Sequence, residues 1–166
     1  MAPAETAVIS AEPSSARLLT RQWPSLRAPV DPYVIARSLG IRVEKIVPPM
    51  DVSGKIAMSA GSTPTISINK RDPDNHQRFT CAHEIWHYMR NAPHRDRDFT
   101  DYRATLAGIG IDEEEIYANQ FAAAIIMPAL EVARLVNAGC DTHQMAQWFR
   151  TSEGAVTLRL KNLRLL

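Results

Sequence analysis

The stretch HEIWH, residues 83–87, decides the architecture that this chain must have. On a helix, side chains four residues apart lie on one face, so the imidazoles of His83 and His87 can reach a single metal ion. Glu84 follows one residue later, where its carboxylate can accept a proton from a water molecule beside the metal. The pattern therefore predicts a helix that carries two zinc ligands and a general base, with a third ligand supplied from elsewhere in the chain.

The flanking residues predict a long, partly buried helix. Asp72 is the expected N-cap, Pro73 the expected first residue, and the helix should run to about Arg90. Cys81 is expected to be a small core residue rather than a ligand. Apolar residues recur at helical spacing and predict the buried face: Phe79, Ala82, Ile85, Trp86 and Met89.

The residues before this helix predict a short capped helix and three strands. Asp31 should cap the short helix and Gly40 should end it. Residues 41–47 alternate in polarity, and residues 54–58 and 65–69 are strand-forming runs separated by turn residues. The predicted fold class is α+β, with a small, mostly antiparallel, three-stranded sheet packed on the motif helix.

A second buried helix should supply the third ligand. It covers residues 112–127, after a charged stretch at residues 90–104 that we expect to be a surface loop, and it is apolar on nearly every side. Glu115 lies near its start, where a carboxylate needs a partner, and is the predicted ligand. Asn119, one turn later, can accept the second N–H of a ligating histidine. The alternative is that Glu115 only completes a capping box with Asp112.

Length, charge and cysteine content limit the class of protein. The chain has 166 residues, a net charge of +1 and two cysteines, Cys81 and Cys140, far apart in sequence. We expect a disordered segment over residues 1–14, a core over 15–128 and a helical tail over 129–166 that packs on the core. No signal peptide or membrane span is predicted, so we expect a cytoplasmic protein, and its oligomeric state is open.

The tail predicts two helices joined by a tight turn over residues 143–166. A DNA-binding helix-turn-helix is one interpretation. Too few basic residues cluster there for a strong phosphate contact, so docking onto the core is favoured and direct nucleic-acid binding is not expected. The expected packing residues, with Trp86 and Trp148 as core aromatics, are Met145, Trp148, Phe149, Val156, Leu158, Leu160 and Leu163.

These motifs resemble those of the ImmA/IrrE metallopeptidases over about residues 15–166. The resemblance rests on VDPYVIARSLGIRV, the Ser53-Gly54 strand start, TISIN, RFTCAHEIWHYM and EIYANQFAAAIIMP, and the tail MAQWFRTSEGAVTLRLKNL is also similar. Trp86 stands where many members have glycine, and Cys81 stands where many have leucine. Neither position is a ligand, but Trp86 can reshape the wall of the site.

The resemblance implies a zincin-like zinc site with one Zn²⁺ per chain, held by His83, His87 and Glu115 with Glu84 as the base. It also implies an endopeptidase, a hydrolase that cleaves or inactivates a helix-turn-helix (XRE-type) repressor encoded nearby, as in anti-repressor and stress-response systems. The alternative is a toxin–antitoxin-like component that acts by binding that partner, and a toxin with a non-protein target is a third possibility. An intact Glu84 favours the enzyme, because a purely structural zinc site needs no base.

A zinc peptidase also needs a group that stabilises the developing oxyanion and a surface that holds the substrate. The sequence does not rank the candidates for oxyanion or substrate contact, which are Tyr88, His94, Arg95, Tyr102 and Tyr117. For the substrate surface we expect residues 65–69 to form an edge strand, along which a peptide could lie extended.

Overall fold

A computed structural model of the chain describes residues 16, 28–48, 52–92, 99–104 and 113–166. They belong to two compact units. The first comprises Asp31–Ala122 and contains the sheet and the motif helix, whereas the second comprises Met1–Val30 with Ala123–Leu166. The boundary at Ala122 falls within helix α5, Glu113–Ile126.

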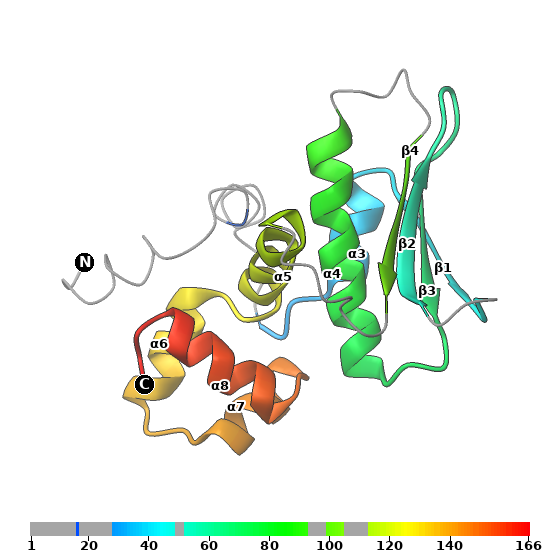
Figure 1. Cartoon of the computed structure of the whole chain (residues 1–166). Coiled ribbons are helices and arrows are strands. Elements are labelled where there is room, and N and C mark those ends of the chain that lie inside the picture. The colour runs from blue at the N-terminus through cyan, green and yellow to red at the C-terminus, as the bar shows by residue number, and fades with distance from the viewer. Residues whose placement is uncertain (1–15, 17–27, 49–51, 93–98, 105–112) are drawn as a thin grey trace. The chain divides into compact units, whose positions relative to one another are not determined.

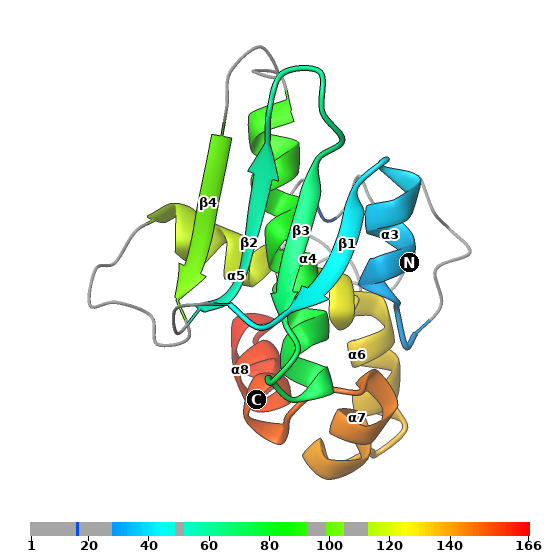
Figure 2. The same cartoon turned by 90° about the vertical axis from the view of Figure 1, so that its right-hand side faces the viewer.

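The first unit is built on a mixed four-stranded sheet in the order β1-β3-β2-β4 (Figure 2). β1 runs parallel to β3, whereas β2 is antiparallel to both β3 and β4. The predicted α+β class is therefore confirmed, and two of the three pairings are antiparallel, β2 with β3 and β2 with β4. The strands are β1 (Arg42–Ile46), β2 (Val52–Met58), β3 (Thr65–Asn69) and β4 (Phe99–Ala104).

β4 lies in the stretch that we predicted to be a surface loop, so the structure corrects that prediction for Phe99–Ala104. The segment contains strand-forming Phe, Thr and Tyr, but charged residues between them hide the hydrophobic pattern. Charge of this kind is usual on an edge strand, where it discourages pairing with another chain.

The prediction that residues 65–69 form an edge of the sheet is wrong. β3 pairs with β1 on one side and with β2 on the other, and the edges are β1 and β4. Residues Ile66, Ser67, Ile68 and Asn69 are all buried, which is typical of a central strand.

Helix α4 (Asp74–Asn91) carries the motif and lies against one face of the sheet (Figure 1). Every residue from Thr80 to Tyr88 is buried, so the central turns are enclosed on all sides rather than along one stripe. The fully buried Ile56, Ile66 and Ile68 of β2 and β3, together with Ile85 of α4, form the core of this unit. Burial of this apolar surface stabilises the packing of α4 against the sheet.

The start of α4 differs from the prediction. Pro73 occupies the N-cap position with extended backbone and no side-chain cap, and the helix begins at Asp74, so Asp72 is not the cap. The Asp72 carboxylate is instead directed toward His76, with its Oδ2 atom 3.7 Å from Nε2. Asp74 places a negative charge in the first turn, which the helix dipole favours.

The short helix α3 (Pro32–Ser38) begins as predicted, because the Asp31 side chain accepts a hydrogen bond of 2.9 Å from the Tyr33 amide. Its buried residues Ile35 and Ala36 lie on a helix that packs against α4 and β1. Cys81 of α4 is fully buried, which confirms its predicted place in the core.

The second unit contains the end of α5 and the helices α6 (Ala129–Asn137), α7 (Thr142–Phe149) and α8 (Glu153–Asn162). Asp141 and Gln144 form a capping box at the start of α7, and the Ser152 side chain caps α8. The buried apolar residues of α7 and α8 agree with the predicted packing set in five positions: Met145, Phe149, Val156, Leu160 and Leu163.

Two residues of that predicted set are exposed instead, Trp148 at 46% and Leu158 at 59%. On α7 the buried stripe is set by residues four apart, and Trp148 lies about 100° away from it. The indole N–H of Trp148 donates to Glu131 Oε1 at 3.1 Å, and the Arg134 guanidinium lies over the ring. The amphipathic tryptophan therefore has surface partners that replace burial.

Within the described part of the chain, no single helix has the length and apolar character needed to cross a membrane. α5 and α6 meet that test only when they are taken together as a bent pair.

Candidate metal centre

α4 and the first turns of α5 bring three metal-ligating side chains to one point. The Nε2 atoms of His83 and His87 are 3.1 Å apart. One carboxylate oxygen of Glu115 lies 3.3 Å from His83 Nε2 and the other lies 3.1 Å from His87 Nε2. Among the described residues these form the group that could hold a metal ion, with ligand atoms all within 4.8 Å of one another.

The spacing of these atoms suits zinc. Zinc–nitrogen and zinc–oxygen bonds of about 2.0–2.1 Å in a tetrahedral arrangement separate neighbouring ligand atoms by roughly 3.3 Å. The two Nε2 atoms are 3.1 Å apart, and each imidazole has one Glu115 oxygen at 3.1–3.3 Å, Oε2 for His83 and Oε1 for His87. Two imidazoles and a carboxylate are also a donor set that zinc prefers. The residues present therefore fit a zinc ion.

Asn119 lies one helical turn after Glu115 and holds the first imidazole. Its Oδ1 atom is 3.1 Å from Nδ1 of His83. Since an amide oxygen accepts, Nδ1 carries the proton, and Nε2 keeps its lone pair for the point where the three side chains meet. A contact of this kind sets both the tautomer and the orientation of a metal-binding histidine.

The electrostatics of the group favour an ionised carboxylate. The close approach of the imidazoles, His83 first and then His87, holds the pKa of Glu115 well below its usual range, against an opposing contribution from burial. The Glu115 carboxylate is thus directed at the imidazoles. The alternative partner in a capping box, Asp112, lies outside the described residues.

Glu84 lies on α4 directly after His83 and is almost fully buried, with 1% of its surface exposed. It is close to β2, since a Cβ atom built on Gly54 would lie 3.6 Å from its Oε1 atom. A carboxylate held in a water-poor environment next to a metal ligand is suited to proton transfer.

An aromatic group connects α4 and α5 beside the ligands. Trp86, which is 7% exposed, packs edge-on against His87 with ring centroids 4.9 Å apart, and its ring centroid is 5.5 Å from that of Tyr117. Arg90 lies over the indole and also forms an ion pair with Glu114 of α5. The prediction that Trp86 belongs to the core is confirmed, and its ring restricts the movement of the second imidazole.

The residues predicted to contact the oxyanion or the substrate lie in different places in the structure. Tyr88 is buried, and its hydroxyl donates to the Leu39 carbonyl at 3.3 Å, so it is directed toward the end of α3. Tyr117 is half-buried against Trp86. Tyr102 lies on β4, but its side chain is outside the described residues, as are His94 and Arg95.

Sequence reasoning did not identify Gly54, Ser53 and His76 as neighbours of this site. Ser53 Oγ lies 2.9 Å from His76 Nε2, one residue before Gly54 approaches Glu84. The available signal was a glycine inside a strand pattern, which often marks a close approach of another element.

Comparison with known proteins relates the chain to a family. The model of the IrrE N-terminal-like domain, a peptidase family, matches residues 36–161 of the chain. The match covers most of the chain and includes His83, Glu84, His87 and Glu115. No curated protein matches the chain.

Proposed function

The chain belongs to the IrrE N-terminal-like domain family of metallopeptidases, and on that premise we propose that it is a zinc-dependent endopeptidase of zincin-like architecture. The observation that carries the proposal is the convergence of His83, His87 and Glu115, whose ligand atoms lie within 4.8 Å of one another. These residues would hold one Zn²⁺ per chain, and zinc bound there would supply Lewis acidity and a more acidic water.

The remaining steps are performed by side chains of the protein. The Glu84 carboxylate accepts a proton from the attacking water as the new C–O bond forms at the scissile carbonyl. It then delivers that proton to the amine nitrogen as the C–N bond breaks, which balances the hydrolysis. Asn119 keeps His83 in the required tautomer throughout. Tyr117, beside Trp86, is our candidate for contact with the oxyanion or the substrate.

We propose that the substrate lies along β4 rather than β3. β4 is an edge of the sheet and pairs with β2, the strand whose Gly54 adjoins Glu84. An extended peptide can add to such an edge through backbone hydrogen bonds. The proposed protein substrate is an XRE-type helix-turn-helix repressor encoded nearby, in keeping with the motifs that resemble the ImmA/IrrE proteins.

The decisive experiment mixes the purified protein with that regulator, with and without zinc, and measures the appearance of fragments. Glu84→Gln keeps the size of the side chain but removes the base, so cleavage should fall by roughly 10²–10⁴-fold. Zinc content and binding of the regulator should be retained. Glu113→Gln, on the exposed start of α5, makes the same chemical change away from α4 and should cleave normally.

Two outcomes would contradict the proposal. Cleavage by Glu84→Gln at the wild-type rate would show that Glu84 is not the base. A wild-type protein that yields no fragments, yet relieves repression as well as Glu84→Gln does, would show that the protein acts by binding its partner.

A further inference from the structure

Gly54 of β2 lies where the strand crosses the turn of α4 that ends at Glu84. A Cβ atom at this position would lie 2.4 Å from Thr80 Cγ2, 3.2 Å from the Ser67 carbonyl oxygen and 3.6 Å from Glu84 Oε1. The first distance is far inside van der Waals contact, so no side chain fits. Glycine is thus required here for the approach of two elements.

The surroundings decide which part would move if a methyl group were added. Ser67 belongs to β3, which is paired on both sides, so its carbonyl cannot retreat. Thr80 is fully buried and β-branched, which leaves it little rotamer freedom. The displacement would therefore fall on the α4 backbone at Thr80, one helical turn before Glu84.

β2 makes a second contact with α4 at the preceding residue. The register skips Ser53 between the pairs Val52↔Ala104 and Gly54↔Arg103, which marks a β-bulge. Bulges redirect side chains, and here the fully buried Ser53 directs Oγ to Nε2 of His76, 2.9 Å away. The strand thus contacts α4 at His76 and again at Thr80 and Glu84.

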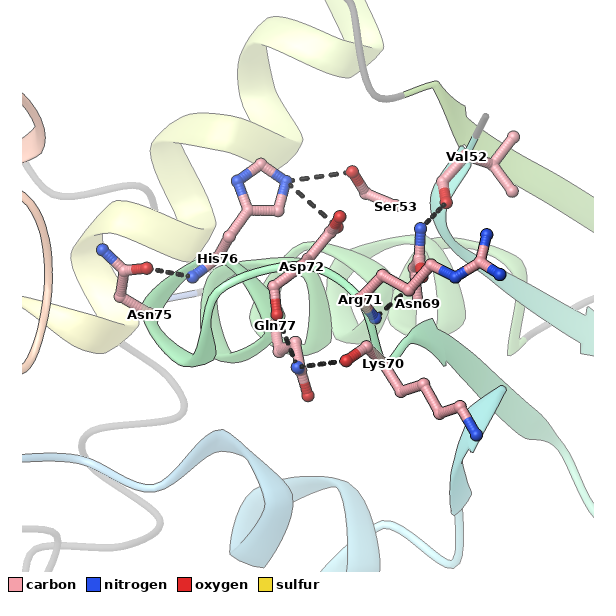
Figure 3. A network of polar contacts seen from close by, with 9 residues as sticks. All are labelled: Val52, Ser53, Asn69, Lys70, Arg71, Asp72, Asn75, His76 and Gln77. Atoms are coloured by element: carbon pink, nitrogen blue, oxygen red, sulfur yellow. Dashed lines mark hydrogen bonds and ion pairs between the residues drawn. The ribbon is translucent and has the colours of Figure 1, made fainter. Parts of the chain in front are cut away.

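Polar contacts hold the turn between β3 and α4 next to this bulge (Figure 3). Asn69 Nδ2 donates to the Val52 carbonyl at 3.2 Å, and Asn69 Oδ1 accepts from the Arg71 amide at 3.0 Å. Gln77 Nε2 donates to the Asp72 carbonyl at 2.7 Å. These bonds fix the position of β2 relative to the start of α4.

Ser53, His76 and Asp72 do not form a nucleophilic triad. Both oxygen atoms approach the same ring nitrogen of His76, Nε2, at 2.9 Å for Ser53 Oγ and 3.7 Å for Asp72 Oδ2. A catalytic triad needs the carboxylate on the other nitrogen, and it needs an accessible serine. The cluster therefore has an anchoring role.

We infer that Gly54 is a positioning residue for Glu84. Because Gly54 has no side chain, β2 can pack closely against the turn of α4 that carries Glu84 and fix the position of that turn. The Ser53–His76 contact holds the strand in this place. The catalytic consequence rests on the proposed endopeptidase function. The inference about placement does not, because it concerns the position of a carboxylate in the folded protein.

The test compares Gly54→Ala with Gly154→Ala, whose added methyl group meets nothing within 4 Å. In metal-free protein, the side-chain carboxyl ¹³C resonance of Glu84, assigned by its loss in Glu84→Gln, should move in Gly54→Ala and stay in Gly154→Ala. In the zinc-loaded enzyme, kcat of Gly54→Ala should fall by roughly 10²-fold, since a shift of about 1 Å has effects of that size. KM should change little.

Removing the clashing atom provides a rescue. Thr80→Ser deletes Cγ2 and keeps the hydroxyl, so the double variant Gly54→Ala/Thr80→Ser should recover thermal stability and should recover the wild-type Glu84 resonance and kcat in large part but not completely. If Gly54→Ala alone does not fold, the double variant carries the comparison, and residual displacement from the Ser67 contact should still lower kcat relative to Thr80→Ser.

The outcomes separate the two proposals. A Glu84 resonance that is unchanged in folded Gly54→Ala, or a kcat equal to that of Gly154→Ala, overturns the positioning role and leaves the endopeptidase proposal standing. A wild-type protein without hydrolytic activity overturns the endopeptidase proposal, whereas a displaced resonance in Gly54→Ala would still support the placement of Glu84 by Gly54.

Discussion

Replacing Glu115 by Gln tests whether the metal group works as a unit. In the native protein, the two carboxylate oxygens lie 3.3 and 3.1 Å from the Nε2 atoms of His83 and His87. Glutamine keeps the size of the side chain but replaces one oxygen by an NH2 group, which has no lone pair for a metal. The group then loses its anionic ligand, and we expect zinc affinity to collapse while the fold persists.

The expected loss can be worked from the ligand count. Zinc binding to structural zinc-finger sites contributes about 10–16 kcal/mol, and a total of that size shared equally among three protein ligands is about 3–5 kcal/mol each. At about 1.4 kcal/mol per factor of ten, losing one ligand should raise the Kd for zinc by roughly 10²–10⁴-fold. Competition against a chromophoric chelator measures Kd over that range.

Glu114→Gln is the matched control, because it makes the same change of charge at the neighbouring position. Glu114 is exposed and forms an ion pair with Arg90, and such pairs contribute at most about 1 kcal/mol to stability. Its Kd for zinc should equal that of the wild type. A Kd for Glu115→Gln within about threefold of the control would refute the reasoning and return Glu115 to a capping role. In that role Asp112 would be the N-cap, and Asp112→Ala should lower the free energy of unfolding by about 1 kcal/mol.

Three further predictions concern other parts of the molecule. Asn119→Ala should weaken zinc binding by roughly 10- to 100-fold in the same competition assay, and an unchanged Kd would contradict its role in orienting an imidazole. A thiol reagent should modify one cysteine of the native protein, Cys140, because burial raises the pKa of the Cys81 thiol and excludes the reagent. Modification of two thiols per chain without denaturant would contradict this prediction. The hydrogen bond to Glu153 raises the pKa of His143, so protonated His143 stabilises the folded protein. This contribution to the free energy of unfolding is fully present below the ordinary histidine pKa and is lost as pH rises through the raised pKa. His143→Gln should thus lower Tm more at about pH 5 than at about pH 9, and the reverse order would refute it.

Much of the fold could be read from local pattern. Residues 41–47 alternate in polarity and contain β1, Arg42–Ile46, and Asp31 before Pro32 predicts the observed cap of α3. The apolar residues of α4 predict that the helix is buried, although not that its central turns are enclosed on all sides. These features depend on residues within a few positions of one another, and the spacing of a helix or strand is a property of the local chain.

Other features depended on contacts that local pattern does not contain. β4 is a strand because β2 offers it a partner, although its charged sequence favoured a loop. β3 is central because β1 adds to it in parallel, so the edge that we expected there is occupied. Trp148 is exposed because a capped eight-residue helix buries a different stripe. In each case the free energy of pairing or packing across elements outweighed the local preference.

The sequence by itself determined the part of the metal group that one helix can supply, which is two of its three residues. His83 and His87 share a face because the helix repeats every 3.6 residues, and Glu84 follows from the same spacing. Only the tertiary structure decided that Glu115 and Asn119 meet those imidazoles, because that contact needs α4 and α5 to pack in one register. It also decided that Gly54 must lack a side chain, since the reason is the closeness of Thr80, a residue of another element. Side chains on one helix are placed by backbone geometry, whereas side chains on different elements are placed by the packing of the whole unit.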